Sequence, residues 1–175
     1  MKQIIGTLAG MAVVAALLAS TAQVSGSSED GAGAIADGRL PAGYRDWRLI
    51  SVAREEGDLD DIRAVLGNDT AITAYRANTQ PFPDGTIIAR LAWSYDSSEE
   101  NNKSFGREQS FVAGHPKNGV QFMVKDAAKY ASTGGWLYAQ FDDGTPLRDE
   151  KQLHSCFVCH QAIKARDYVF TKYAR

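Results

Sequence analysis

Hydrophobic and polar residues alternate along several short stretches of this 175-residue chain, which is the pattern of half-buried strands. The clearest stretch is 86–95, where Ile87 and Leu91 share one side of an extended chain and Ile88 and Arg90 share the other. Shorter or less regular strands are predicted at 47–53, 61–66, 109–113, 119–125 and 136–141.

Helix signals lie between these strands. Asn68 and Asp69 are suitable capping residues for a helix that follows them. A short helix is predicted at 126–131 and a longer one at 147–164, whereas the polar stretch 96–103 is predicted to be an exposed loop. This order of elements predicts an α+β fold, with a mostly antiparallel sheet and a few flanking helices.

The beginning of the chain differs from the rest. Lys2 is followed by an uncharged, largely apolar run at 4–19 and then by Ser20-Thr21-Ala22, which suits cleavage by signal peptidase. The run is short for a membrane span, which needs about 20 apolar residues, so an uncleaved anchor is the less favoured alternative. We therefore expect three regions: a signal peptide at 1–22, a disordered leader at 23–40 and one domain at 41–175.

Composition narrows the functional classes. The formal net charge is −2 at pH 7, which argues against nucleic acid or an anionic membrane surface as the main partner. The chain has 2 cysteines, Cys156 and Cys159, which lie too close together to form the disulfide framework of a small exported domain. The fold must therefore rely on its core and on whatever these two cysteines bind.

The segment Cys156-Phe157-Val158-Cys159-His160 has the Cys-x-x-Cys-His pattern that attaches c-type haem. On a helix the two cysteines and the histidine share one face, so two thioether bonds and an iron–imidazole bond can form together. We expect one covalent haem c on the C-terminal helix, with His160 as an axial ligand of the iron. The alternatives are a thioredoxin-like dithiol, which is typical of a βαβ context, and a zinc site, which needs more ligands.

The second axial position of the iron has few candidates. Met123 is the one methionine outside the predicted signal peptide and is a weak candidate for a sixth ligand, because a strand methionine more often serves packing. His115 precedes Pro116 in a predicted loop, and His154 is too close to the motif to reach the opposite side of a haem. We therefore expect five-coordinate iron, which binds small molecules, over six-coordinate iron, which mainly passes electrons.

The chain resembles the cytochrome P-460 family, which includes the cytochromes c′-beta, through short segments that follow the family's order between Pro41 and Tyr173. These segments are Tyr44-Arg45-Asp46-Trp47, Phe82-Pro83-Asp84-Gly85-Thr86, Val124-Lys125-Asp126, Trp136, the haem motif, and Asp167-Tyr168-Val169-Phe170-Thr171. The resemblance implies a sheet-rich α+β subunit, a homodimer and a five-coordinate haem. It also implies one of two activities. Some members oxidise hydroxylamine and carry a lysine linked to the haem rim, whereas the c′-beta members bind nitric oxide in an apolar, aromatic-capped pocket.

The resemblance also suggests residues for the distal side of the haem. Arg90 occupies the position of the linking lysine, and a guanidinium stays protonated and cannot act as the nucleophile of such a link. Arg63 matches a distal arginine of the family. The alternatives are a surface arginine for Arg90 and an exposed ion pair with Asp60 or Asp61 for Arg63. The candidates for an aromatic cap, each with core packing as its alternative, are Phe82, Phe105, Phe111, Phe122 and Phe141.

Together these inferences predict a periplasmic c-type haem protein that binds nitric oxide or a similar small nitrogen ligand and has a periplasmic redox partner. The alternatives are an oxidoreductase that acts on hydroxylamine or nitric oxide, and a simple electron-transfer cytochrome c. Arg90 favours ligand binding over hydroxylamine oxidation, and the scarcity of methionine disfavours the electron carrier.

Overall fold

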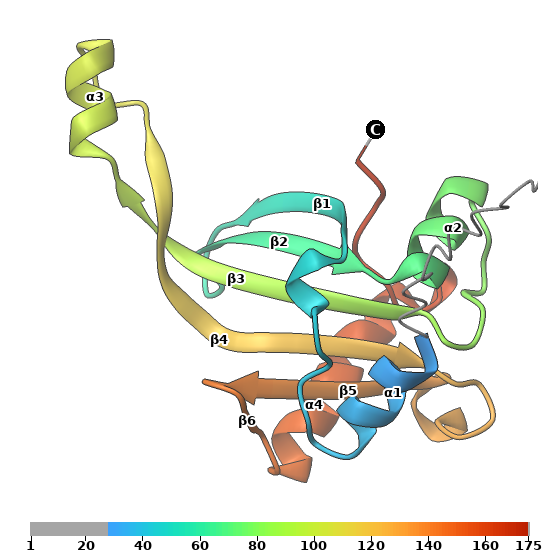
Figure 1. The fold of residues 1–175 in the computed structure, drawn as a ribbon. Coiled ribbons are helices and arrows are strands. Elements are labelled where there is room, and N and C mark those ends of the chain that lie inside the picture. Colours follow the sequence, from blue (N-terminus) through green and yellow to red (C-terminus); the bar gives the residue numbers. More distant parts are fainter. Residues whose placement is uncertain (1–27, 175) are drawn as a thin grey trace, which may run out of the picture.

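The computed structural model describes residues 28–174, which form one sheet flanked by helices (Figure 1). The strands are β1 (Arg48–Glu55), β2 (Asp61–Gly67), β3 (Ile87–Ser97), β4 (Phe111–Lys125), β5 (Trp136–Asp142) and β6 (Thr145–Pro146). The α-helices are α1 (Ser28–Ala36), α2 (Asp69–Ala77), α3 (Glu99–Phe105) and α4 (Glu150–His160). Three short 3₁₀ segments connect them: η1 (Tyr44–Asp46), η2 (Ala131–Thr133) and η3 (Gln161–Arg166).

Each strand pairs antiparallel with the next strand along the chain, from β1 to β6. In this register Ile88 lies opposite Gly67 and Met123, and Met123 lies opposite Tyr138. The side chains of Ile88, Met123 and Tyr138 therefore point to the same face of the sheet. The predicted α+β fold with an antiparallel sheet is confirmed.

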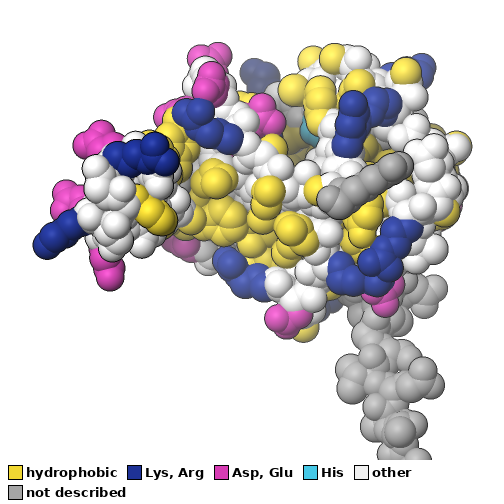
Figure 2. Space-filling model, turned by 90° about the horizontal axis from the view of Figure 1, so that it is seen from above, with side chains coloured by type: hydrophobic (Ala, Val, Ile, Leu, Met, Phe, Trp, Pro, Cys, Tyr) yellow, Lys and Arg dark blue, Asp and Glu magenta, His cyan; other side chains and the backbone are white. Residues whose placement is uncertain are grey.

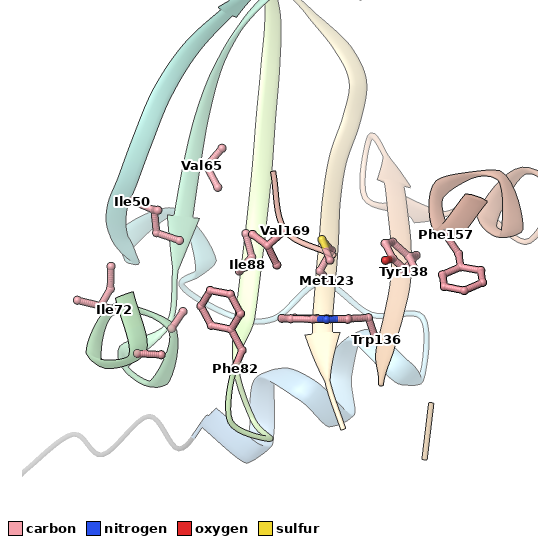
Figure 3. Close-up of a cluster of buried hydrophobic side chains, with 12 residues drawn as sticks. Ile50, Val65, Ile72, Phe82, Ile88, Met123, Trp136, Tyr138, Phe157 and Val169 are labelled. Carbon is pink, nitrogen blue, oxygen red and sulfur yellow. The ribbon is translucent and has the colours of Figure 1, made fainter. Parts of the chain in front are cut away.

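Both faces of the sheet are buried over much of their area. On one face, here called the α4 face, residues of β2 to β5 such as Val65, Ile88 and Met123 pack with Phe157 of α4 (Figure 3). On the opposite face, the α1 face, Ile35 of α1 covers buried strand residues, namely Ile87, Ala89, Leu91, Val120, Phe122, Val124 and Phe141. The two sets interleave along β3, as its period-two pattern predicts.

The predicted helix after Asn68 is confirmed as α2. The Asn68 side-chain oxygen accepts a hydrogen bond from the backbone N–H of Ala71 at 3.0 Å, which is the N-cap contact. The same oxygen accepts a second bond from Ile87 N at 3.0 Å. The cap thus also ties the start of α2 to the start of β3.

The helix that carries the motif is shorter than predicted. The Asp149 carboxylate accepts hydrogen bonds from the backbone N–H groups of Lys151 and Gln152 at 2.9 and 3.2 Å, so α4 begins at Glu150 and not at residue 147. After His160 the chain continues as η3, so the predicted helix at 147–164 changes type within its length.

The segment between β3 and β4 differs most from the prediction. Neither the loop at 96–103 nor separate strands at 109–113 and 119–125 are present. Ser98 caps α3, and Gly106, with φ of 69°, ends it. β4 is continuous because two register shifts against β3 carry it past Pro116. Residues 96–116 form an arm, which projects from the body of the sheet (Figure 1).

The short helix predicted at 126–131 is a turn that leads into η2. The Asp126 side chain accepts a hydrogen bond from Lys129 N at 2.9 Å, which closes the turn. Gly134 and Gly135, with φ of 71° and 85°, then reverse the chain into β5. The segment is therefore a turn and not the predicted helix.

Residues 28–36, expected to belong to a disordered leader, form α1. Its Ile35 is only 2% exposed and joins the core of the α1 face, and this burial offsets the entropy lost on ordering. The predicted signal peptide at 1–22 lies outside the described residues. Within 28–174 there is no helix long and apolar enough to cross a membrane.

Candidate haem site

The last turns of α4 carry the three motif residues. Cys156 and Cys159 form no disulfide; Cys156 is half-buried against the core of the α4 face and Cys159 is exposed. His160 is the last residue of α4. Their spacing places the three side chains on one side of the helix. Phe157 turns toward the sheet instead, where its ring centroid lies 6.4 Å from that of Tyr138, and so it docks the helix.

His160 is held by one hydrogen bond and two aromatic rings. Its Nδ1 lies 2.6 Å from the carbonyl oxygen of Tyr168. The rings of Tyr138 and Phe170 meet it edge-on, with centroids 5.2 and 5.0 Å away. Because a carbonyl oxygen only accepts, the proton sits on Nδ1 and Nε2 carries the lone pair.

The surroundings of His160 also keep its ring neutral. Burial lowers its pKa from the ordinary value of 6.5, although the hydrogen bond to Tyr168 acts in the opposite direction. The ring is therefore uncharged near pH 7. A neutral imidazole with a fixed tautomer is the form that binds a metal ion.

A row of polar side chains crosses the α4 face beside the row that contains Tyr138. Arg90 lies opposite Gln121, and Gln121 lies opposite Gln140, each two residues along its strand from the apolar row. Arg90 Nη1 donates to Gln121 Oε1 at 2.8 Å, and Gln121 Nε2 donates to Gln140 Oε1 at 2.9 Å. This side of the sheet therefore offers hydrogen-bonding groups next to the aromatic contacts of His160.

A buried carboxylate, Asp61, joins both predicted arginines. Arg63 Nε and Nη2 donate to its two oxygens at 2.7 and 2.8 Å, and Arg90 Nη2 donates to Oδ2 at 2.5 Å. The Asp61 side chain has no exposed surface, and those of Arg63 and Arg90 are 14% and 17% exposed. Arg63 thus pairs with Asp61, the partner that its alternative named, but the pair is largely buried and not exposed; Arg90 is not a surface arginine.

The cluster contains two positive groups and two negative groups, of which only Asp61 contacts both arginines. Two guanidinium groups share Asp61, and the next carboxylate, Glu55, lies 3.6 Å from Arg63. Burial, followed by the nearby charge of Arg63, lowers the pKa of Arg90, but a guanidinium stays protonated at neutral pH. The α4 face therefore holds two protonated guanidinium groups that Asp61 fixes in place.

The candidates for a sixth iron ligand lie in three different environments. Met123 is 9% exposed and packs in the core of the α4 face beside Ile88 and Tyr138. His115 is exposed on β4, and His154 is exposed on α4 itself. Of these three, only Met123 shares the sheet face that contacts His160. Within residues 28–174 no group of three or more His, Cys, Asp or Glu side chains could hold a metal ion.

The five phenylalanines predicted as candidates for an aromatic cap divide among three places. Phe82 lies in the core of the α4 face, with its ring edge-on to Trp136 at 5.9 Å. Phe122 and Phe141 lie in the core of the α1 face, and Phe105 and Phe111 are exposed on the arm. Only one of the five shares the face with His160.

Sequence reasoning named Asp61 as a possible partner of Arg63, but it missed the bond from Asp61 to Arg90 and the rings that contact His160. Tyr138 could have been found from strand alternation, because Trp136, Tyr138 and Gln140 share one side of the predicted strand at 136–141. Asp61 precedes Arg63 by two residues and therefore shares its side of the strand. The position of Phe170 depends on how the chain turns back after η3, for which no local signal exists.

The donor set of this site fits a c-type haem. Two thiols and an imidazole with an available Nε2 are the groups that attach and ligate it. Burial raises the pKa of the Cys156 thiol, so it stays protonated at neutral pH. The buried Tyr138 hydroxyl, beside His160, has no hydrogen-bond partner within the described residues, and a polar group of a bound cofactor would satisfy it.

Comparison with known protein families agrees with this donor set. Residues 41–171 match the model of the family described as Cytochrome P460. The match covers most of the chain and includes the motif, Asp61, Arg63 and Arg90, and it confirms the resemblance found in the sequence. No curated protein matches the chain.

Proposed function

Because the chain belongs to the cytochrome P460 family, it is a c-type haem protein, and we propose that it binds nitric oxide or a similar small nitrogen ligand at five-coordinate iron. Cys156 and Cys159 would hold one haem through thioether bonds, and His160 Nε2 would ligate the iron. When bound, the haem supplies an iron with one open axial position. The protein's part is to fix the imidazole, to shield the site and to place donors beside the ligand.

The identity and bonding of Arg90 carry the proposal. Its guanidinium is held by Asp61 and Gln121. The resemblance to the family implies that Arg90 takes the place of the lysine that hydroxylamine-oxidising members bond to the haem. A group that keeps its proton cannot form that bond. Arg90 and Arg63 are instead suited to donate hydrogen bonds to a bound oxide or to a haem propionate.

Two other functions remain as alternatives. The family supports hydroxylamine oxidation, but this chain lacks the lysine that its hydroxylamine-oxidising members bond to the haem. A simple electron carrier would use Met123 as the sixth ligand, and Met123 is the candidate that lies on the same sheet face as the contacts of His160. Ligand binding is preferred because it needs neither a lysine link nor movement of a core methionine.

We also propose that the protein is exported to the periplasm through the signal peptide at 1–22, where c-type haem proteins exchange electrons with soluble redox partners. The apolar run and the small residues before position 23 support export. The redox partner would be needed to return the iron to its ferrous state.

A homodimer is proposed from the apolar groups that the subunit exposes. Leu49 and Val52, on the α1 face of the edge strand β1, are 52% and 62% exposed, and Phe105 and Phe111 of the arm are each 58% exposed. Hydrophobic side chains gather beside the arm in Figure 2. A second copy would cover such groups in a symmetric interface. Sedimentation of the mature holoprotein at several concentrations tests this, and a monomer at all of them would contradict it.

Optical spectra of the mature protein, produced with a haem-maturation system, test the main proposal. We expect a high-spin ferrous spectrum of ordinary position that changes on addition of carbon monoxide or nitric oxide. A strongly red-shifted ferrous Soret band that survives denaturation would indicate a lysine-type modification and hydroxylamine oxidation. A low-spin spectrum unaffected by carbon monoxide would indicate an electron carrier. Turnover of hydroxylamine with an electron acceptor is the direct measure of catalysis.

A further inference from the structure

The segment that follows the motif is fastened to the sheet by a buried ion pair. Lys125 Nζ, at the end of β4, lies 2.7 Å from Asp167 Oδ1, and the two side chains are 5% and 9% exposed. Lys125 also donates to the Gly134 carbonyl at 3.2 Å and lies 4.9 Å from the centre of the Trp136 ring. These residues are far from the Asp61 cluster in the sheet and have no part in the proposed ligand site.

Asp167 makes two further contacts that fix its backbone. Its Oδ2 accepts a hydrogen bond from Phe82 N at 2.8 Å, and its carbonyl oxygen accepts one from Trp136 Nε1 at 2.9 Å. Asp167 and the next residue, Tyr168, both have positive φ, 50° and 63°, which side-chain-bearing residues seldom adopt. The contacts of Asp167 therefore hold the chain in a conformation that it would not keep alone.

The strained turn positions the hydrogen-bond acceptor that sets the tautomer and orientation of the His160 ring. The carbonyl oxygen of Tyr168 is the acceptor 2.6 Å from His160 Nδ1. It belongs to the residue directly after Asp167, so a shift of Asp167 moves this acceptor. A hydrogen bond from Nδ1 sets the tautomer and the orientation of a metal-bound imidazole and raises its basicity.

We propose that Lys125 and Asp167 are positioning residues for His160, because their ion pair holds the Tyr168 carbonyl that accepts the Nδ1 proton. This inference rests on the proposed role of His160 as the iron ligand. Through that carbonyl, the pair strengthens electron donation from the imidazole and so favours ferric iron over ferrous. Apolar residues can often replace a buried ion pair without loss of stability, so the location of this pair beside the post-motif turn favours a role in positioning.

The test compares two variants of the mature holoprotein with the wild type. Asp167→Asn removes the charge but suits positive φ and keeps an oxygen for Phe82 N. Lys125→Met removes the ammonium and keeps the length of the side chain. The readouts are the iron–histidine stretching frequency in the resonance Raman spectrum of the ferrous protein and the reduction potential. Both variants should lower the stretching frequency and shift the potential to more positive values.

Two control variants separate positioning from general destabilisation. Ile87→Val loosens the core on the α1 face, and Asp69→Asn breaks the exposed pair with Arg48; both should leave the stretch and the potential at wild-type values. If Lys125→Met does not yield holoprotein, the result for Asp167→Asn decides the test. A wild-type stretching frequency and reduction potential in Asp167→Asn would overturn this inference but leave the proposed function untouched. A ferrous wild type without an iron–histidine stretch would overturn the proposed ligation and the inference with it.

Discussion

Arg90 Nη2 lies 2.5 Å from Oδ2 of Asp61, across the β2–β3 ladder, and the Asp61 side chain has no exposed surface. The same carboxylate receives two bonds from Arg63. One acidic group thus fixes both arginines on the face of the sheet that contacts His160. Contacts within the protein therefore set their geometry, which is the condition for effective electrostatic stabilisation of the proposed ligand.

Removing the Asp61 charge should destabilise the protein strongly. Asp61→Asn removes the shared counter-ion of two partly buried guanidinium groups, of which Arg63 keeps Glu55 at 3.6 Å. Breaking a fully buried pair costs about 3–5 kcal/mol, and we expect a loss toward the lower end of that range. Urea unfolding of the holoprotein measures the loss. The matched control is Asp69→Asn, which breaks an exposed pair with Arg48 and should cost less than about 1 kcal/mol. Equal losses in the two variants would show that the Asp61 cluster is not energetically distinct.

Arg90→Gln should weaken the electrostatic field at the bound ligand while Arg63 keeps Asp61 paired. In the ferrous carbon monoxide adduct, loss of a nearby positive charge raises the C–O stretching frequency. Loss of a charge-assisted hydrogen bond should also speed nitric oxide dissociation on the order of tenfold. The control is Arg54→Gln, since Arg54 is an exposed arginine with partners Glu56 and Tyr95. An unchanged infrared spectrum in Arg90→Gln would place Arg90 outside the ligand site.

Covalent attachment is tested by the two cysteines together. Cys156→Ala with Cys159→Ala leaves no sulfur for a thioether bond, so haem staining after denaturing electrophoresis should fall to background. His160→Ala is the comparison, because it retains both thioether bonds and loses only the axial ligand. Undiminished staining in the double variant would refute the attachment.

Gly134 should be less replaceable than other glycines of similar conformation. A Cβ added at Gly134 would lie 2.2 Å from the ring of Tyr168, whereas one added at Gly106 meets nothing within 4 Å, and the φ values are 71° and 69°. Gly106→Ala should cost only the strain of a left-handed residue, about 1–2 kcal/mol. Gly134→Ala should cost clearly more in thermal or urea unfolding, because Tyr168 must also move.

The protein should lose stability at alkaline pH through Tyr75. Burial raises the pKa of this phenol well above its ordinary value of 10.0, and its hydroxyl donates to the Thr171 carbonyl. Below pH 10 both the folded and the unfolded chain keep the proton. Above it the unfolded chain releases the proton first, so this group should lower the free energy of unfolding by about 1.4 kcal/mol per pH unit. Tyr75→Phe should remove that contribution, and an identical slope in the variant would contradict the assignment.

The sheet and the haem motif could be predicted from the sequence because each is encoded by residues close together in the chain. Alternation along 86–95 predicts both faces of β3, and Asn68 predicts the start of α2. The motif fixes Cys156, Cys159 and His160 by spacing alone. Such signals depend on residues a few positions apart, which a single chain displays directly.

The remaining features depend on residues that are distant in sequence. α1 is ordered because Ile35 reaches the core of the α1 face, which its polar neighbours do not predict. The link from Arg90 to Asp61 spans 29 residues and that from Lys125 to Asp167 spans 42. To predict these two contacts one must know the strand register and the path of the chain after η3. Local periodicity gives neither.

The order of the strands has a consequence for how the molecule is assembled. Every ladder joins neighbours along the chain, so each strand can pair with the one before it and the sheet is complete at Pro146, a topology that favours rapid formation. Both cysteines of the motif come after that point. A chain that emerges from its N-terminus can therefore build the whole sheet first, while the thiols stay accessible for the thioether bonds proposed above.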